Sequence, residues 1–319
     1  MSRGSASVLG AIGQTPAVWL DRLTAGLPGR VLLKLESLNP GGSVKDRPAL
    51  QCIVDAEAEG RLRPGVPVVE LTSGNMGIGL AIACAVEGYR LIAVMSEGNS
   101  PERRQLLAAY GAEIELVPQA AGGSAGKVSG EDLALVEERT RQLVHELGAW
   151  RPDQFNNPSN PRAHELGTGP ELWRQADEVL DAFVTIIGTG GTFVGVARAL
   201  KARSPSIRCL AVEPASAQAL AGLPIWDPAH KLQGAGYAMI PPLWESALCD
   251  GTMPIDDAEA VRVARDLARR EGILAGFSTG ANVAAALRLA GQVPTGIRIG
   301  TIACDSGARY LSGDLFASG

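Results

Sequence analysis

Hydrophobic and polar positions along the chain follow two alternating patterns. Short apolar runs rich in β-branched residues predict strands at Arg30–Leu35, Pro67–Leu71, Arg90–Met95, Glu113–Val117, Ala182–Ile187, Ile207–Val212 and Arg298–Ile302. Longer Ala- and Leu-rich stretches predict helices at Asp46–Gly60, Gly77–Gly88, Pro101–Tyr110, Asp132–Leu147, Phe193–Ala202, Ala258–Glu271 and Ala281–Ala290. Because strands and helices take turns and several strands are continuously apolar, we expect an α/β fold with mainly parallel sheets covered by helices on both faces.

The length of the chain favours two domains over one. Its 319 residues, of which 46% are hydrophobic, can form more than one large core. The stretch Ala149–Pro161 is rich in proline and asparagine, and we interpret it as the passage between two halves that each contain a sheet. We predict a larger domain made of residues 1–40 plus 151–319 and a smaller domain made of residues 41–150.

Charge and cysteine content narrow the class of protein. Charged residues make up 20% of the chain, are mixed in sign and sum to a net charge of -5, so nucleic acid is a poor candidate partner. No stretch approaches the roughly 18 apolar residues of a membrane span, and the N-terminus lacks the apolar core of a secretory signal, so we expect a cytoplasmic protein without membrane association. The cysteines form no CxxC pair and the histidines are dispersed, which favours buried apolar cysteines over a metal site or disulfides. These residues are Cys52, Cys84, Cys209, Cys249, Cys304, His145, His164 and His230.

The stretch NPGGSVKDRP places Lys45 just after two adjacent glycines and a serine. Glycines let a ligand approach the backbone closely, so this context suits a lysine that must meet a bound molecule. Taken alone, a solvated surface lysine is the better interpretation of Lys45.

A second glycine cluster comprises Gly188, Thr189, Gly190, Gly191 and Thr192, between a predicted strand and a predicted helix. Free N–H groups at a helix start favour a phosphate dianion. A tight turn without a ligand explains the cluster equally well. The spacing is not that of a dinucleotide-binding GxGxxG motif, although the downstream acid Glu213 keeps that alternative open.

A third cluster, Thr72, Ser73, Gly74, Asn75 and Met76, again lies between a predicted strand and an apolar helix. Hydroxyls, an amide and backbone N–H groups at a helix N-terminus suit a carboxylate. An ordinary helix cap explains one of these polar residues but not three together.

Two other motifs fail on inspection. GFSTG, around Ser278, matches the nucleophile elbow of α/β-hydrolases, but that fold needs a later histidine and none follows His230. Ser278 therefore has another role or is a helix cap. The Gly- and Ser-rich stretch Ala120–Asp132 has the wrong glycine spacing before Lys127 for a phosphate-binding P-loop, and we interpret it as a flexible loop.

The remaining clusters suit one ligand. A lysine amine, a phosphate cup, a carboxylate cup and a hydroxyl at a helix start match pyridoxal 5′-phosphate bound to an amino acid. Lys45 then forms the Schiff base with the cofactor.

The same segments resemble, over almost the whole chain, the cysteine synthase and cystathionine β-synthase family of fold-type II pyridoxal-phosphate enzymes, which includes O-acetylserine sulfhydrylase. The resemblance implies a tryptophan synthase β-like fold of two three-layer αβα domains with the active site in the cleft between them. It also implies that the larger domain binds the cofactor phosphate and that the smaller one is mobile and binds substrate. The matching segments occur in the expected order: Ile12–Pro16, Lys34–Ala49, Thr72–Ile78, Glu102–Arg104, Gln154–Pro161, Thr168–Trp173, Gly188–Thr192, Gln233–Gly236, Gly276–Ala281 and Asp305–Ser312.

The resemblance assigns roles to individual residues. Lys45 forms the Schiff base and acts as the catalytic base, Asn75 hydrogen-bonds the cofactor's 3′-oxygen, and Ser278 faces the pyridine nitrogen. The phosphate is held by Gly188, Thr189, Gly190, Gly191 and Thr192. The implied substrate-binding residues are Thr72, Ser73, Gly74, Met76 through its N–H, Gln154 and Gly234.

The implied reaction is β-replacement on an O-activated L-serine through an α-aminoacrylate, giving L-cysteine or another β-substituted alanine. O-acetylserine is favoured over O-phosphoserine because residues 233–242 hold no arginine. A homodimer is the expected assembly. Met76, Tyr237–Met239 and the segment from Cys304 depart from the usual pattern on the substrate side and put sulfide as the nucleophile in doubt.

Three alternatives stay open. Relatives from specialised metabolism use amine nucleophiles to make 2,3-diaminopropionate precursors, or make O-ureidoserine. For an anionic acceptor, Arg103, Arg104 and Arg162 are candidate contacts, although solvation explains each of them. A serine or threonine dehydratase-type lyase is the second alternative. A non-catalytic binding protein is the third, and Lys45 argues against it.

Overall fold

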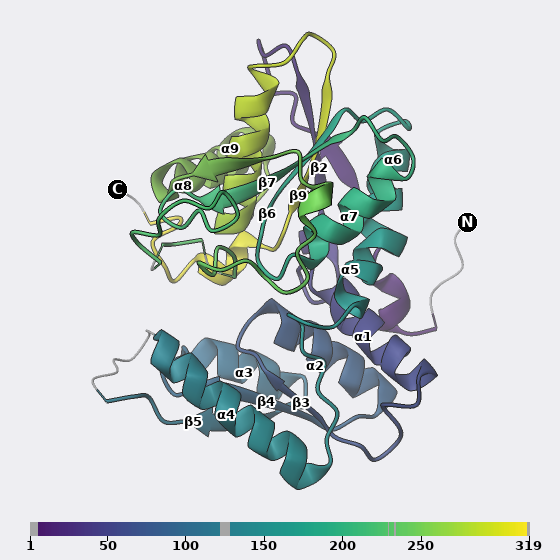
Figure 1. Cartoon of the computed structure of the whole chain (residues 1–319), viewed down its shortest axis with the longest axis vertical. Coiled ribbons are helices and arrows are strands. Elements are labelled where there is room, and N and C mark those ends of the chain that lie inside the picture. The colour runs from purple at the N-terminus through teal and green to yellow at the C-terminus, as the bar shows by residue number, and fades with distance from the viewer. Residues whose placement is uncertain (1–5, 122–127, 229, 233, 318–319) are drawn as a thin grey trace. The chain divides into compact units, whose positions relative to one another are not determined.

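The computed structural model describes residues 6–121, 128–228, 230–232 and 234–317 and divides into two units (Figure 1). The smaller unit contains Lys45–Ser159 and the segment that ends at Ile12, and the larger contains Gly13–Val44 and Asn160–Gly319. The predicted division placed the first residues with the larger domain. The structure groups them with the smaller one, because Leu9 of the 3₁₀-helix Val8–Ala11 packs in the smaller unit's core.

The smaller unit is built on a three-stranded parallel sheet of order β3-β4-β5. Side chains of alternate strand residues point to opposite faces. Val68 and Ala93 pack on one face with α1 and α2, whereas Val69 and Val94 pack on the other face against α4. The elements are β3 (Val68–Leu71), β4 (Leu91–Ser96), β5 (Glu113–Val117), α1 (Asp46–Ala58), α2 (Asn75–Glu87), α3 (Pro101–Ala109) and α4 (Gly130–Leu147).

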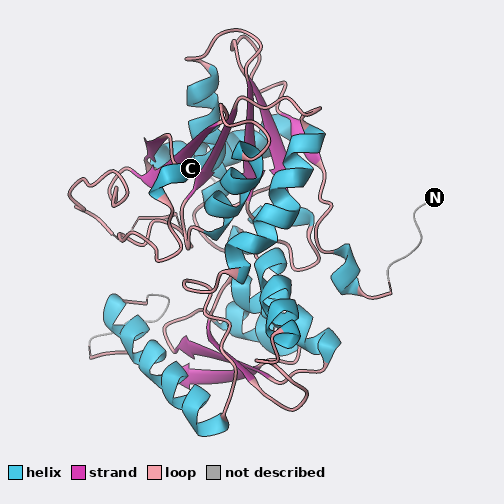
Figure 2. Ribbon diagram, turned by 45° about the vertical axis from the view of Figure 1, so that its right-hand side comes forward, coloured by secondary structure: helices cyan, strands magenta, loops and turns pink. Residues whose placement is uncertain are grey.

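The larger unit is built on a six-stranded sheet of order β1-β2-β9-β6-β7-β8, in which β1 runs antiparallel to β2 and the other neighbours are parallel. Figure 2 shows helices on both faces of this sheet. Leu33 and Val184 pack with α8 and α9, whereas Leu32 and Phe183 pack with α6 and α7. The strands are β1 (Ala17–Trp19), β2 (Arg30–Leu35), β6 (Ala182–Ile186), β7 (Arg208–Pro214), β8 (Gly251–Ile255) and β9 (Arg298–Ala303). The helices are α5 (Ser159–Ala163), the π-helix His164–Thr168, α6 (Gly169–Gln175), α7 (Gly191–Lys201), α8 (Asp257–Asp266) with its π-helical extension Leu267–Glu271, and α9 (Phe277–Ala290). The 3₁₀-helices are Glu36–Leu38, Ser246–Leu248 and Gly307–Tyr310.

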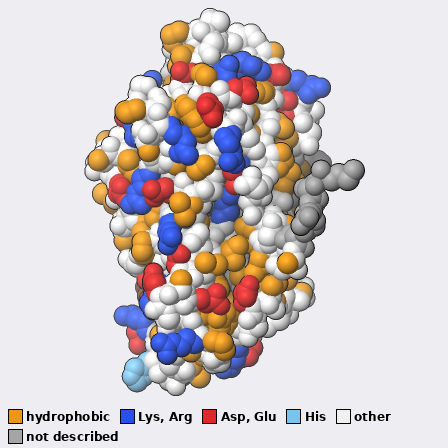
Figure 3. Space-filling view, turned by 90° about the vertical axis from the view of Figure 1, so that its right-hand side faces the viewer, with side chains coloured by type: hydrophobic (Ala, Val, Ile, Leu, Met, Phe, Trp, Pro, Cys, Tyr) orange, Lys and Arg blue, Asp and Glu red, His pale blue; other side chains and the backbone are white. Residues whose placement is uncertain are grey.

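Several structural observations concern the cysteines, the apolar helices and the side chains that could bind a metal. The five cysteines are free thiols, and burial raises the pKa of Cys84 and Cys209 to about 12. In the part of the chain that the structure describes, no helix is long and apolar enough to cross a membrane and no cluster of side chains is arranged to hold a metal ion. On the face drawn in Figure 3, basic and acidic side chains are interspersed.

The predicted flexible loop Ala120–Asp132 is only partly described, since residues 122–127 lie outside the described ranges. Its last residues are helical, because α4 begins at Gly130. Ser129 and Asp132 form a capping box in which each side chain accepts a hydrogen bond from the other's backbone N–H, at 3.1 and 2.7 Å.

Candidate active site

The larger unit has a topological switch point between β6 and β9. After β6 the chain continues to β7 and β8 on one side of the sheet and then returns to β9 on the other side (Figure 1). Loops that follow the two strands at such a point diverge, and open α/β sheets bind ligands there, outside the carboxyl ends of the strands. The predicted phosphate loop, Gly188–Thr192, follows β6 directly.

The glycines of this loop are required by close packing. A Cβ at Gly188 would lie 2.5 Å from Gly234 O, and a Cβ at Gly191 would collide with Asn160 Oδ1. Gly190 has a φ of 86°, in the left-handed region that favours glycine. The structure thus brings Gly234, a predicted substrate residue, against the predicted phosphate loop.

The threonines of the loop are fixed by two residues that sequence reasoning did not identify. Asn160 Nδ2 donates to Thr189 Oγ1 at 2.9 Å, and His164 Nε2 lies 3.2 Å from Thr192 Oγ1. Both partners are fully buried. Asn160 lies in the segment Gln154–Pro161, which resembles a family motif, so that motif could have identified it as a site residue. Nothing in the sequence pointed to His164, because a single histidine forms no recognisable motif.

The chain segment that leads to Lys45 runs beside the residues that follow β9. Val44 N donates to Cys304 O at 2.8 Å, and Ser306 N donates to Gly42 O at 3.3 Å. The turn that carries Ser278 lies on the same residues, because Thr279 Oγ1 accepts a hydrogen bond from Cys304 N at 3.0 Å. The segment before Lys45 and the start of α9 therefore both lie next to the residues that follow the C-terminal end of β9.

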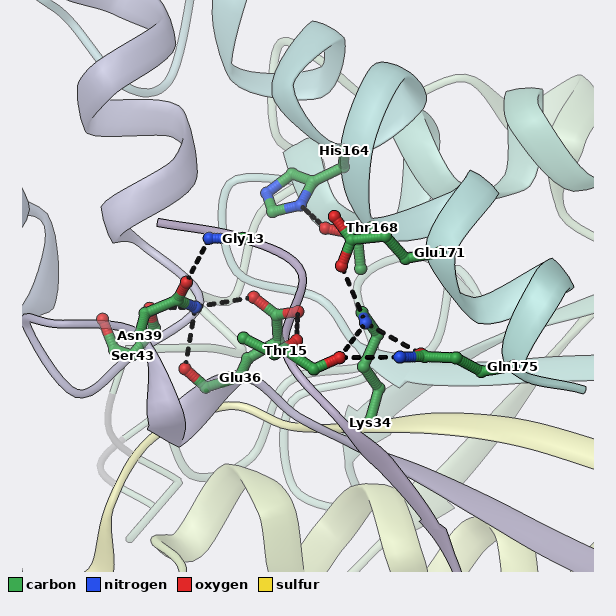
Figure 4. Close-up of polar contacts among 10 residues, drawn as sticks. All are labelled: Gly13, Thr15, Lys34, Glu36, Asn39, Ser43, His164, Thr168, Glu171 and Gln175. Carbon is green, nitrogen blue, oxygen red and sulfur yellow. Dashed lines mark hydrogen bonds and ion pairs between the residues drawn. The ribbon is translucent and has the colours of Figure 1, made fainter. Parts of the chain in front are cut away.

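A buried polar network holds the segment before Lys45 in place (Figure 4). Lys34, which is 0% exposed, donates to Glu171 Oε2 at 2.8 Å and to Thr15 O at 2.8 Å. Asn39 Nδ2 contacts Glu36 Oε2 at 2.8 Å and Ser43 O at 3.1 Å. Because each of these side chains is buried, the network fixes the backbone two residues before Lys45.

In the smaller unit, Lys45 is the N-cap residue of α1 and is half-buried. Gly79 in α2 allows a close approach to it, since a Cβ there would lie 2.8 Å from Ala49 Cβ and 3.1 Å from Lys45 O. The first turns of α2 therefore pack against the start of α1. The structure brings Lys45 and the predicted carboxylate loop into one region of this unit.

The N-cap residue of α2 is Gly74, which has no side chain to cap the helix. The interpretation of Thr72, Ser73 and Asn75 as an ordinary cap is therefore wrong, and the first N–H groups of α2 are not satisfied by a capping side chain at that position. Met76 is 3% exposed and packs in the hydrophobic core, so a ligand near this loop meets its backbone and not its thioether.

Gln154 lies in a turn beside the end of β3. Trp150 N donates to Pro67 O at 2.9 Å and Val69 N donates to Trp150 O at 3.0 Å, so this part of the chain runs along β3. Asp153 N then donates to the carboxylate of Glu70 at 2.6 Å. Gln154 is thereby held near the loop that follows β3, although some 80 residues separate them in sequence.

Other candidates have different roles. Both carboxylate oxygens of Glu213 accept backbone N–H groups, from Leu220 at 2.7 Å and Ala221 at 3.1 Å, which accounts for this acid without a ribose. Arg103 NH1 lies 3.5 Å from Ser73 Oγ, whereas Arg104 binds backbone carbonyls before α3 and Arg162 is exposed on α5.

Comparison with known proteins identifies the family and several relatives. The family described as pyridoxal-phosphate dependent enzymes matches residues 8–305. A cysteine synthase of Staphylococcus aureus is 43% identical over 96% of this chain and 95% of that protein. An O-ureido-L-serine synthase of Streptomyces lavendulae is 42% identical over 97% of this chain and 92% of that protein.

Solved structures of similar proteins share the fold. The crystal structure of an O-ureido-L-serine synthase has a TM-score of 0.88 at 41% identity and covers 98% of this chain and 96% of its own. That of O-acetyl serine sulfhydrylase isoform 3 from Entamoeba histolytica has a TM-score of 0.91 at 35% identity, covering 99% of this chain and 92% of its own.

Proposed function

Because this chain belongs to the family of pyridoxal-phosphate dependent enzymes, we propose that it catalyses β-replacement on an O-activated L-serine, with O-acetyl-L-serine as the donor. The product is L-cysteine or another β-substituted alanine, according to the nucleophile that adds at Cβ. When bound, the cofactor supplies an electron sink for the bonds at the substrate's Cα.

One observation carries the proposal for the site. The N-caps of α2, α7 and α9 are Gly74, Gly190 and Gly276, so none of these helices is capped by a side chain at that position. Helices α4 and α8 are capped by the side chains of Ser129 and Asp256, whereas α1, α3 and α6 have non-glycine N-cap residues that also make no capping bond. Glycine at the N-cap of α2, α7 and α9 lets an anion approach the first N–H groups closely, and those groups and the helix dipole both favour negative charge.

The residues present suit the cofactor. Gly188–Thr192 offer backbone N–H groups and two hydroxyls, with no carboxylate among them, which is a donor set for a phosphate dianion. We assign the phosphate to this loop, the 3′-oxygen to Asn75 and the pyridine nitrogen to Ser278. A neutral hydroxyl at that nitrogen favours rapid loss of a β-substituent over chemistry that needs a long-lived carbanion.

Lys45 is assigned as the residue that holds the cofactor covalently and as the catalytic base. Its Nζ would hold the cofactor's aldehyde carbon as an imine, with loss of water. Once the substrate's amine has displaced it, the free Nζ amine would take the proton from the substrate's Cα and return it to that carbon after the nucleophile has added. The place of Lys45 at the N-terminus of α1 supports this role, since the positive end of a helix dipole disfavours an ammonium relative to a neutral amine.

The donor's carboxylate is assigned to Thr72, Ser73, Gln154 and the N–H of Met76. O-acetylserine fits better than O-phosphoserine because residues 234–242 carry no cationic side chain for a second dianion. Because the side chain of Met76 packs in the core and offers no hydroxyl or charge, the nucleophile is assigned as a small one such as sulfide or hydroxyurea.

The test is product analysis by mass spectrometry. The holoenzyme is given O-acetyl-L-serine or O-phospho-L-serine, each with sulfide, hydroxyurea or a primary amine. We expect a β-substituted alanine from O-acetyl-L-serine, and a loss of at least about 100-fold in kcat for Lys45→Ala. Lys231→Ala, which removes only a surface ion pair with Asp314, is the matched control. Pyruvate without an adduct would indicate a lyase, and no turnover of either donor would refute β-replacement.

A further inference from the structure

Glu70 is a buried carboxylate that the proposed chemistry does not use. It lies on β3 and is 2% exposed. Its Oε2 accepts a hydrogen bond from Asp153 N at 2.6 Å, and its Oε1 lies 3.7 Å from Arg151 Nε. Burying a carboxylate is unfavourable unless it is paired, so a residue of this kind calls for a reason beyond filling the core.

The position of Glu70 joins two stretches of chain. Thr72 and Ser73 follow it directly along the chain, and Gln154 follows its partner Asp153. Asp153 has a φ of 47° and starts a turn in which its carbonyl accepts the N–H groups of Asn156 and Asn157, at 3.1 and 2.9 Å. The bond from Asp153 N to Glu70 therefore sets where this turn, and Gln154 in it, lies relative to the loop after β3.

One arginine and several acidic groups surround the carboxylate of Glu70. Arg151 faces it and forks onto Glu137 of α4 with two bonds of 2.8 and 2.7 Å. Asp153 and the buried Cys52 of α1 are the other titratable groups near the carboxylate. Burial raises the pKa of Glu70 to about 7, while Arg151 and the N–H of Asp153 oppose the rise. The contacts with Arg151 and with Asp153 N therefore favour the charged carboxylate, whereas its buried surroundings oppose it.

We propose that Glu70 is a positioning residue, which fixes Gln154 against the Thr72–Ser73 loop so that both stretches bind one substrate carboxylate. This inference rests on the proposed function, since it presumes that these residues bind the donor. A misplacement of about 1 Å at such a site is enough to cost about 100-fold in rate. One directed hydrogen bond between the two stretches prevents that misplacement.

The test is a double-mutant cycle on the holoenzyme with Glu70→Ala, Gln154→Ala and the double variant. KM and kcat for O-acetyl-L-serine are measured together with cofactor affinity. We expect Glu70→Ala to raise KM about 10- to 100-fold with little change in cofactor affinity. In the Gln154→Ala background it should add little, because it acts through Gln154. Glu70→Gln keeps an acceptor oxygen for Asp153 N and should restore a KM within about threefold of wild type.

Independent, additive effects of the two substitutions on KM would overturn the inference, as would a loss of cofactor affinity in Glu70→Ala equal to its effect on KM. A wild-type KM in Gln154→Ala with full activity would instead refute the proposed carboxylate site. If Glu70→Ala does not fold, Glu70→Met takes its place, because it fills similar space and offers no acceptor to Asp153 N. Its KM should rise about 10-fold or more, whereas that of Glu70→Gln should stay within about threefold of wild type. The same KM in Glu70→Met and Glu70→Gln would contradict the inference.

Discussion

At the scale of single residues, the predicted phosphate loop has no space for a side chain at Gly191. A Cβ at Gly191 would collide with Asn160 Oδ1, which also holds the loop through Thr189. Gly191→Ala is therefore expected to weaken cofactor binding at least tenfold, measured by titrating the apoprotein with pyridoxal 5′-phosphate. Gly130→Ala at the start of α4 is the control, since its Cβ meets nothing within 4 Å and the change should leave cofactor binding unaltered. Equal affinity in the two variants would argue against the loop as the phosphate site.

Glu70 gives a pH dependence of stability with a definite sign. Its pKa is raised from 4.5 to about 7 by burial, so the folded protein binds the proton more tightly than the unfolded chain. Between these values stability falls as the pH rises, by a total on the order of 3 kcal/mol from this group. Urea unfolding at several pH values should show this loss in the wild type and not in Glu70→Gln. Parallel pH profiles for the two proteins would contradict the assignment.

At the scale of elements, the ion pair of Lys34 and Glu171 joins β2 to α6 (Figure 4). Lys34→Met leaves the buried carboxylate of Glu171 without its cation and should lower the free energy of unfolding by about 3–5 kcal/mol. Adding Glu171→Leu should recover most of this loss. Arg262→Ala breaks an exposed pair with Asp266 and should change stability by less than about 1 kcal/mol. Equal losses in thermal unfolding for the buried and exposed pairs would show that burial does not decide their strength.

The uncapped start of α2 predicts a trade between stability and binding. Gly74 has an extended φ of -128°, and a Cβ there meets nothing within 4 Å, so serine fits. In Gly74→Ser the hydroxyl can cap the helix and add a few tenths of a kcal/mol. The same hydroxyl occupies N–H groups assigned to the donor's carboxylate, so KM for O-acetyl-L-serine should rise while the melting temperature holds or increases. An unchanged KM would remove this helix end from the substrate site.

At the scale of the whole molecule, hydrophobic periodicity predicted much of the fold. The predicted strands are all present, and Arg30–Leu35 and Glu113–Val117 have the predicted bounds. The two unpredicted strands are weak in pattern, because β1 has three residues at a sheet edge and β8 contains Pro254. The division of the strands into two sheets came from the proline- and asparagine-rich stretch Ala149–Pro161, whereas the order of strands within each sheet was not predicted, since pairing depends on contacts far apart in sequence.

Several helices begin earlier than predicted, both at the candidate site and at α4, which begins at Gly130 and not at Asp132. The helices α2, α7 and α9 begin two to four residues before their predicted starts, within the stretches NMG, GTF and FSTG. Glycine, serine and asparagine there have the composition of loops, so the pattern places these residues outside the helices, although they form the first helical turns. Buried partners such as Asn160, His164 and Glu70 were missed because their roles depend on tertiary contacts and not on local pattern.

The most direct test of the account is to identify the residue that carries the cofactor. The holoenzyme is reduced with sodium borohydride, which fixes the cofactor on the nitrogen that holds it, then digested and mapped by mass spectrometry. The account predicts a phosphopyridoxyl group on Lys45, in the peptide that contains GGSVKDR. The group on any other lysine (Lys34, Lys127, Lys201 or Lys231), or a protein that binds the cofactor and gives no labelled lysine, would contradict it.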